Sequence, residues 1–134
     1  MTVELEIPPR SAYVGVVRLT LSLLARAAGL DAGSVEGLKI AVSEACTNAV
    51  LAGEEIGSDA PVGITWIEND DSLLIEIEDR SSRSSPEDIK DPYDSQGFSS
   101  RLVMSSALLQ SLVDECEYSQ LPGGGLLTRL VVRH

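Results

Sequence analysis

The sequence predicts a two-layer α/β sandwich, in which a mixed and mostly antiparallel sheet carries its helices on one face. Short segments that alternate apolar and polar residues indicate strands, and polar turns join most of them in pairs. Longer segments with apolar residues every three or four positions indicate helices, whose apolar faces must be buried against that sheet. A length of 134 residues with 43% hydrophobic content favours one domain that spans residues 1–134.

The first half of the chain predicts one strand followed by two helices. Residues 3–7 alternate apolar and polar side chains, and two prolines end the strand that this pattern indicates. Residues 12–28 carry apolar side chains at three- and four-residue steps, so we expect a helix there that ends before a glycine. Asp31 or Ser34 can cap a second helix, whose apolar stripe fades at Gly53 or soon after it.

The second half predicts two hairpins with a third helix between them. Residues 62–67 and 73–78 indicate strands, and the polar residues between these two segments suit a short turn. Residues 101–113 are apolar enough for a third helix. Residues 116–119 and 126–132 indicate the two strands of a final hairpin.

Two segments without regular periodicity lie between these elements. Residues 80–100 are rich in Ser, Asp and Pro, and so long a polar stretch in a small domain is more often a functional loop or lid than a connector. The glycine triplet at 123–125 lacks the Lys-Ser/Thr pair of a phosphate-binding P-loop. We therefore expect the triplet to form a flexible turn at the tip of the final hairpin.

The charge of the chain limits the partners that it can have. Ten basic residues against 21 acidic ones give a net charge of −11, which repels nucleic-acid phosphates and anionic membranes over most of the surface. We therefore expect no direct contact with nucleic acid or membrane, and instead a protein partner with a basic face.

The expected location is the cytoplasm. No apolar run reaches the ~18 residues that a membrane span requires, and the acidic start of the chain lacks the pattern of a secretion signal. Cys46 and Cys116 lie far apart in apolar segments, which in a reducing compartment favours buried free thiols over a disulfide or a metal pair.

A glutamate and an asparagine one helical turn apart are candidates for chemistry. Glu44 and Asn48 lie about 40° apart around the second predicted helix, at the rim of its buried face. An amide oxygen is a suitable ligand for Mg²⁺, which usually takes further ligands from water and substrate phosphates. A carboxylate one turn away can deprotonate a hydroxyl that attacks a phosphoryl group. The alternative is a solvent-facing polar pair on an amphipathic helix.

A third candidate is the aspartate that follows the strand predicted at 73–78. Asp79 lies where this strand meets the polar segment, and strand ends that open into loops are common ligand positions. Its carboxylate only accepts hydrogen bonds, so it can select the amino group of a purine. Equally, an aspartate at this place can cap the turn or face water.

Together these residues resemble a known family. Residues 13–22 (YVGVVRLTLS) and 38–50 (LKIAVSEACTNAV), with residues 4–9 before them, closely resemble the anti-sigma factor serine kinases of RsbW type. That family belongs to the histidine-kinase-like (GHKL) ATPase superfamily. The segment around Glu44 and Asn48 is similar to the family's N-box, and the predicted element order is that of its Bergerat-type sandwich.

The resemblance implies a role for each matching residue. Asn48 would be the Mg²⁺ ligand, with the metal bridging the phosphates of ATP. Glu44 would be the catalytic carboxylate that activates the serine hydroxyl of a substrate protein. Asp79 would accept a hydrogen bond from the adenine amino group, Gly97 would help to bind the nucleotide phosphates, and Arg18 would bind partner proteins.

The resemblance also implies partners and a regulatory task. Such a kinase holds a sigma factor away from RNA polymerase. It also phosphorylates a STAS-type anti-anti-sigma protein on serine, which prevents that antagonist from releasing the sigma factor. Members of the family commonly form homodimers.

The chain departs from the family's pattern at three places. Asp79-Arg80-Ser81 stands where the family has Asp-x-Gly, and Leu51 stands where a histidine is usual. Gly97 is the one glycine that could stand in for the family's Gly-x-Gly run at the start of the third helix. These departures leave an alternative open, in which the chain is a partner-binding regulator of the same fold with weak or no ATP binding.

Overall fold

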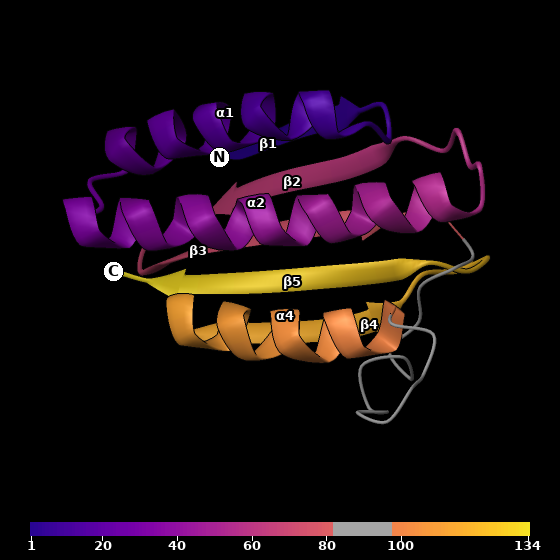
Figure 1. Ribbon diagram of the computed structural model, residues 1–134. Helices are drawn as coiled ribbons and strands as arrows, with labels where there is room; N and C mark the ends of the chain where they lie inside the picture. The colour runs from indigo at the N-terminus through magenta and orange to yellow at the C-terminus, as the bar shows by residue number, and fades with distance from the viewer. Residues whose placement is uncertain (82–97) are drawn as a thin grey trace.

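The computed structural model describes residues 1–81 and 98–134, and its helices cover one face of a single sheet (Figure 1). In chain order the described elements are β1 (Thr2–Ile7), the 3₁₀-helix η1 (Ser11–Tyr13), α1 (Val14–Ala27), α2 (Ala32–Glu55), β2 (Val62–Glu68), β3 (Ser72–Asp79), α4 (Phe98–Leu112), β4 (Glu115–Gln120) and β5 (Leu126–Arg133). The predicted two-layer α/β sandwich with helices on one face is confirmed.

The five strands lie in the order β1-β2-β3-β5-β4, and each of these four pairings is antiparallel. The two hairpins predicted from the sequence are β2–β3 and β4–β5. Residue Thr128 of β5 pairs with Ile77 of β3 on one side and with Tyr118 of β4 on the other. Two residues further along, Asp79 pairs with Leu126. This corner of the sheet, at the end of β3, is where the candidate site lies.

One hydrophobic core fills the space between the sheet and the helices. Strand residues at alternate positions point toward the helices, as the burial pattern of β3 shows, and they meet the apolar stripes of α1, α2 and α4. The largest fully buried side chains of this core are Trp66, Leu21, Leu38, Ile64, Leu73, Ile75, Ile77, Leu109 and Leu130.

The α2 helix begins at a cap and ends where the sequence predicts. The Asp31 side chain accepts a hydrogen bond from the Ser34 backbone N–H at 2.8 Å, and this bond is the main reason that the pKa of Asp31 is lowered. The helix runs to Glu55, two residues beyond Gly53, and Gly53 packs closely against Pro9. A Cβ at Gly53 would lie 3.3 Å from the Cβ of Pro9.

The third predicted helix begins earlier in the structure than in the prediction. The structure begins α4 at Phe98 rather than at residue 101, because a serine-rich first turn has no apolar periodicity to mark it. Most of the predicted lid at 80–100, and Gly97 with it, lie outside the described residues.

Both cysteines are free thiols, as expected. Cys46 is fully buried in the core, and this burial raises the pKa of its thiol to about 12. Cys116 is half-buried on β4, and burial also raises its pKa. No helix within residues 1–81 or 98–134 combines the length and the apolar character needed to cross a membrane.

Candidate functional site

The central feature of the site is a polar contact between α2 and α4. Asn48 is 9% exposed, and its Nδ2 donates a hydrogen bond to Ser105 Oγ at 2.7 Å. The Ser105 hydroxyl in turn donates to the carboxylate of Glu44, which is half-buried one turn before Asn48. The solvent-facing alternative is therefore wrong for Asn48, which is buried, whereas Glu44 is half-buried and contacts α4 through Ser105.

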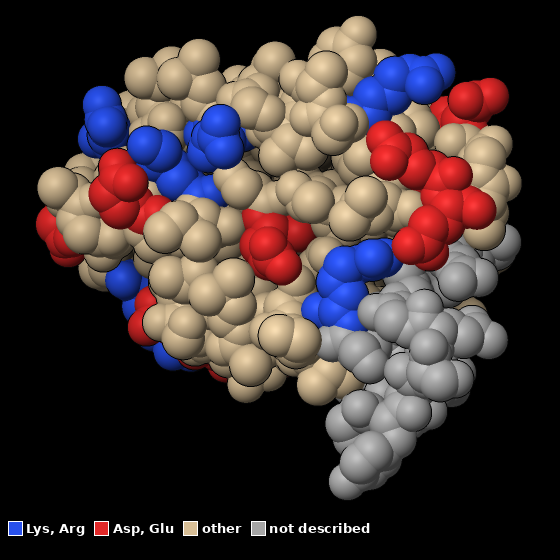
Figure 2. Space-filling model, in the orientation of Figure 1, with Lys and Arg blue, Asp and Glu red and all other residues tan. Residues whose placement is uncertain are grey.

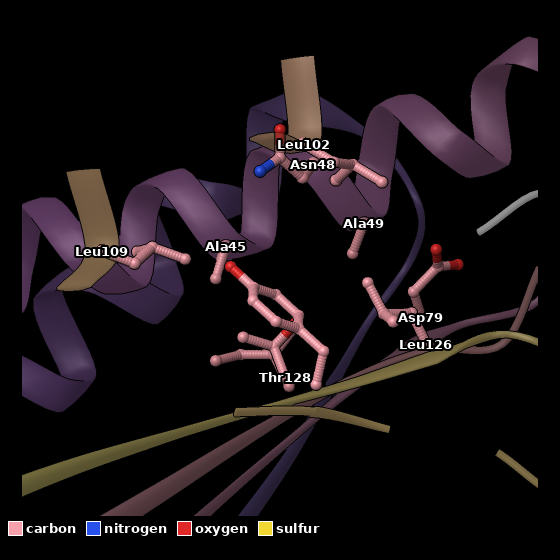
Figure 3. Close-up of a pocket in the computed structure, with 10 residues that line it drawn as sticks. Ala45, Asn48, Ala49, Asp79, Leu102, Leu109, Leu126 and Thr128 are labelled. Carbon is pink, nitrogen blue, oxygen red and sulfur yellow. The ribbon is translucent and has the colours of Figure 1, made fainter. Parts of the chain in front are cut away.

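A small closed cavity, the inner hollow, lies beside Asn48. It is lined by Asn48 of α2, Asp79 of β3, Thr128 of β5 and the α4 leucines Leu102 and Leu109, among others (Figure 3). Figure 3 shows the two leucines on the helix side of the hollow and Thr128 on the sheet side. Its volume of about 10 Å³ is room for about one water molecule. A nucleotide needs several hundred Å³, so the hollow in this conformation is too small to hold one.

Asp79 occupies the sheet end of the inner hollow. It is 5% exposed, which excludes the alternative that it faces water. Its Oδ1 accepts a hydrogen bond from the Ser81 backbone N–H at 2.9 Å, so this oxygen does cap the turn after β3. The neighbouring Ser81 hydroxyl is also buried, and it has no hydrogen-bond partner among the described residues. Polar groups are thus gathered at this end of the hollow.

Arg80 occupies the variable position of the family's Asp-x-Gly pattern and lies outside the hollow. Its guanidinium forms ion pairs with Glu78 at 3.1 Å and with Glu6 at 3.6 Å, both on the sheet face that the helices leave uncovered. Gly63 of the intervening strand provides the space, since a Cβ there would lie 2.9 Å from the Arg80 guanidinium. The residue that replaces the family's glycine is Ser81, which is buried beside Asp79.

On the other side of Glu44 lies an open groove, the outer groove, between α1 and α2. It has a volume of about 410 Å³ and is lined by Arg18, Lys39, Ile40, Ser43 and Glu44, together with Glu36 and Thr47. Arg18 lies 3.5 Å from Ser43 Oγ, to which its Nη1 donates. Lysine and arginine side chains gather where α1 and the first half of α2 lie side by side (Figure 2). Within the groove itself, the two basic side chains Arg18 and Lys39 are balanced by the two carboxylates of Glu36 and Glu44.

Four of the five predicted site residues are thereby placed. Glu44 and Arg18 share the outer groove, and Asn48 and Asp79 share the inner hollow. The Ser105 hydroxyl connects Glu44 with Asn48, so the two spaces meet at this residue. Gly97, the fifth predicted residue, lies outside the described residues.

Three residues of the site were not predicted from the sequence: Ser105, Thr128 and Tyr118. Ser105 could have been suspected, because it lies three residues after Leu102 and four before Leu109 and so shares their buried face. Thr128 is the buried polar position in an otherwise apolar alternation along β5. Burial chiefly raises the pKa of Tyr118, and contact with Cys116 and the charge of Glu44 add to it.

The donor groups present fit a magnesium-bound adenine nucleotide. A buried carboxylate with a nearby hydroxyl, as in Asp79 and Thr128, suits a purine edge, and the Asn48 amide suits Mg²⁺. The described residues contain no cluster of three His, Cys, Asp or Glu side chains that could hold a metal by itself. A Mg²⁺ ion here would therefore take most of its ligands from nucleotide phosphates and water, which is its usual behaviour.

Comparisons with known proteins point to the same chemistry. The family model described as "Histidine kinase-like ATPase domain" matches residues 7–132. The serine-protein kinase RsbW of Bacillus pumilus is 37% identical over 125 residues, which cover 86% of this chain and 76% of that protein. The protein of the same name from Staphylococcus aureus is 34% identical over 128 residues, covering 90% and 80%.

A third relative matches this chain over a shorter stretch. The serine-protein kinase RsbW of Bacillus subtilis is 40% identical over 77 residues, which cover 58% of this chain and about half (48%) of that relative. The resemblance to RsbW-type kinases is therefore confirmed by a family model and by relatives that match over most of their length. This chain belongs to the histidine kinase-like ATPase family, among its RsbW-type serine-protein kinases.

Proposed function

We propose that this chain is an anti-sigma regulatory factor with serine kinase activity. It binds and sequesters a sigma factor, and it uses Mg-ATP to phosphorylate a STAS-type anti-anti-sigma protein on serine. One observation supports this proposal above the others. Glu44 lies at the boundary between the open outer groove, which holds Arg18, and the closed inner hollow, which holds Asn48 and Asp79.

A protein kinase needs this kind of two-sided site. The acceptor serine must arrive from a partner protein, and the outer groove is open to one. The nucleotide must be held where water is excluded, and the inner hollow is enclosed by apolar side chains of α4 and the sheet. A carboxylate between the two spaces can reach a hydroxyl that enters from outside.

Each residue then has a defined task. The Glu44 carboxylate accepts the proton of the acceptor serine hydroxyl, so that the serine oxygen can attack the γ-phosphorus of ATP while the bond to the leaving ADP breaks. The Asn48 amide oxygen binds Mg²⁺, and the Asp79 carboxylate accepts a hydrogen bond from the adenine amino group. Bound Mg-ATP supplies the phosphoryl group and the charge neutralisation that its transfer requires.

The partner surface is proposed to lie on α1. Val16, Leu19 and Leu23 are 55%, 61% and 56% exposed, and their three- and four-residue spacing places them on one face. Such an exposed apolar stripe marks a protein interface more often than free surface. Arg18 lies on the same helix and adds a charged anchor, while the net charge of −11 favours approach to the basic surface of a sigma factor.

The proposal is tested by adding Mg-ATP and both partners. Because a ligand that binds only the folded state stabilises it, Mg-ATP at a hundred times its Kd should add about 2.7 kcal/mol, or roughly 10 °C in melting temperature. A STAS-domain protein from the same genome should gain one phosphate in intact-mass spectra. If millimolar Mg-ATP shifts nothing while a sigma factor still co-purifies, the chain is an ATP-independent binder and the kinase proposal is wrong.

A further inference from the structure

Ser105 occupies an unusual place in the interface between α4 and α2. Leu102 and Leu109 are 3% and 1% exposed, and Ser105, on the same face between them, is 3% exposed. A hydroxyl therefore lies in the middle of an otherwise apolar helix contact. Burying a hydroxyl costs free energy unless it is hydrogen-bonded, so its partners decide whether the arrangement is stable.

Both partners of Ser105 are residues of the proposed catalytic site. Its oxygen accepts from Asn48 Nδ2 at 2.7 Å, and its hydroxyl donates to the Glu44 carboxylate. We call these two hydrogen bonds the Ser105 latch. In this conformation the proposed metal ligand and the proposed base are both bonded to a side chain of their own protein. On Glu44, the Ser105 hydroxyl takes the place that an acceptor serine hydroxyl would need.

The residues around the latch also close the inner hollow. Leu102 and Leu109 line the hollow opposite Thr128, so the α4 face that carries Ser105 is the wall that keeps the volume near 10 Å³ (Figure 3). A nucleotide can enter only if this wall moves away from α2. Because Ser105 lies on that wall, the same movement breaks both bonds of the latch.

We propose that the Ser105 latch holds the site closed and sets its affinity for Mg-nucleotide. This inference rests on the proposed function and adds a residue that controls access to the site. The protein is then an equilibrium between a latched form and an open form that binds nucleotide. Apparent affinity is reduced by the fraction of molecules that are open, so a stronger latch means weaker binding.

Removing the hydroxyl should shift this equilibrium toward the open form. In Ser105→Ala the latched form loses two hydrogen bonds and leaves Asn48 and Glu44 buried without this partner, whereas the open form loses nothing at the site. The net free energy that hydrogen bonds of this kind contribute to the latched form corresponds to about tenfold tighter binding of Mg-ATP once they are removed. A residue with a merely structural role would lower stability without tightening nucleotide binding.

The test measures the Kd of Mg-ATP by calorimetry for the full chain and its variants. Ser106→Ala is the matched control, because Ser106 is 7% exposed on the same helix but bonds to Gln110 rather than to Glu44 or Asn48. Ser105→Cys keeps the side-chain shape with a weak hydrogen-bonding group, and it serves as the second variant if Ser105→Ala folds poorly. Faster amide hydrogen exchange in α4 of the nucleotide-free variant gives a readout without ATP.

The outcomes separate this inference from the proposed function. About tenfold tighter binding by either Ser105 variant, with the Ser106 control within about twofold of the parent, supports the latch. Unchanged or weaker binding by the Ser105 variants, while the parent protein binds Mg-ATP, overturns the latch and leaves the kinase proposal standing. Absence of Mg-ATP binding in the parent and in all variants overturns both.

Discussion

Gly125 lies directly against the main-chain carbonyl of Asp79. A Cβ at position 125 would stand 2.1 Å from the Asp79 carbonyl oxygen and 3.0 Å from that of Ser81, and the φ of Gly125 is +102°. The turn between β4 and β5 thus supports the end of β3, where the proposed adenine ligand is presented. The predicted turn is present, and one of its glycines is required by a close approach rather than by flexibility alone.

Substitution of Gly125 should therefore disturb the site, and Gly123 provides the matched control. Gly123 also has a positive φ, +87°, but a Cβ there would meet nothing within 4 Å. We expect Gly123→Ala to cost about 1 kcal/mol from backbone conformation alone, and Gly125→Ala about 3 kcal/mol or more, with weaker Mg-ATP binding. Urea unfolding of both variants measures the difference. Equal losses would show that the contact with Asp79 does not matter.

The buried thiol of Cys46 should make stability depend on alkaline pH. Burial raises the pKa of this thiol from the ordinary value of 9.0 to about 12. Below pH 9.0 the thiol is therefore protonated in both the folded and the unfolded chain, and the full stability that its burial provides is present. As the pH rises from 9.0 toward 12, the unfolded chain loses the thiol proton while the folded chain keeps it. Unfolding is then favoured by about 1.4 kcal/mol per pH unit for this group.

A Cys46→Ala variant isolates this effect from other groups that titrate in the same range. At pH 7 the variant should be less stable by about 1 kcal/mol, because a small cavity replaces the sulfur. Between pH 9 and 12 its free energy of unfolding should fall less steeply than that of the parent. Urea unfolding in reducing buffer at pH 7, 10 and 11 measures both slopes, and parallel slopes would contradict the assignment to Cys46.

The elements of the fold could be predicted from sequence because each depends on a local pattern. Strand alternation and helical spacing are visible within a few residues, and the cap at Asp31 is recognisable from its type alone. Errors are confined to boundaries such as the start of α4, where the first turn is polar. Glu44 and Asn48 could be selected because a carboxylate or amide at the rim of an apolar helix face is unusual, and Asp79 because it follows a strand that opens into a polar segment.

The rest of the site depends on contacts that no local pattern contains. The hydrogen bond between Asn48 and Ser105 joins residues 57 positions apart, so it exists only after α4 packs on α2. Likewise, the need for glycine at 125 arises from the carbonyl of Asp79 on another strand. The closed volume of the inner hollow is a property of this packing too, and sequence composition carries no record of it.

Asn48→Ala should separate phosphotransfer from partner binding. The proposed metal ligand is lost, so phosphorylation of the STAS protein should fall to background, while the sigma factor still binds because Arg18 and the α1 stripe are untouched. Stability should fall by about 1–2 kcal/mol through loss of the bond to Ser105. Intact-mass spectrometry and co-elution with the sigma factor measure the two activities. Asn69→Ala, the same substitution at an exposed position after β2 that lines neither space, is the control and should retain both.

Arg18→Ala should weaken partner binding and leave nucleotide binding intact, which is the opposite pattern to Asn48→Ala. The reason is that Arg18 lines the outer groove and not the inner hollow that would hold nucleotide. Its side chain is exposed, so its loss should leave the melting temperature and the Mg-ATP shift unchanged. Association with the sigma factor should weaken by tenfold or more, about 1.4 kcal/mol or above, as expected for an arginine anchor. Calorimetric titration of the sigma factor measures this change.

Arg26→Ala distinguishes a specific anchor from general electrostatic attraction. Arg26 is exposed on the same helix but does not line the outer groove, so its removal changes the net charge by the same amount. If the groove position matters, Arg18→Ala weakens sigma-factor binding by at least tenfold, while Arg26→Ala changes the affinity by no more than about twofold. Raising the salt concentration should weaken sigma-factor binding by the same factor in both variants, because they have the same net charge. Equal effects of the two substitutions would mean that partners respond to the overall field of α1, and the groove would lose its proposed role in docking.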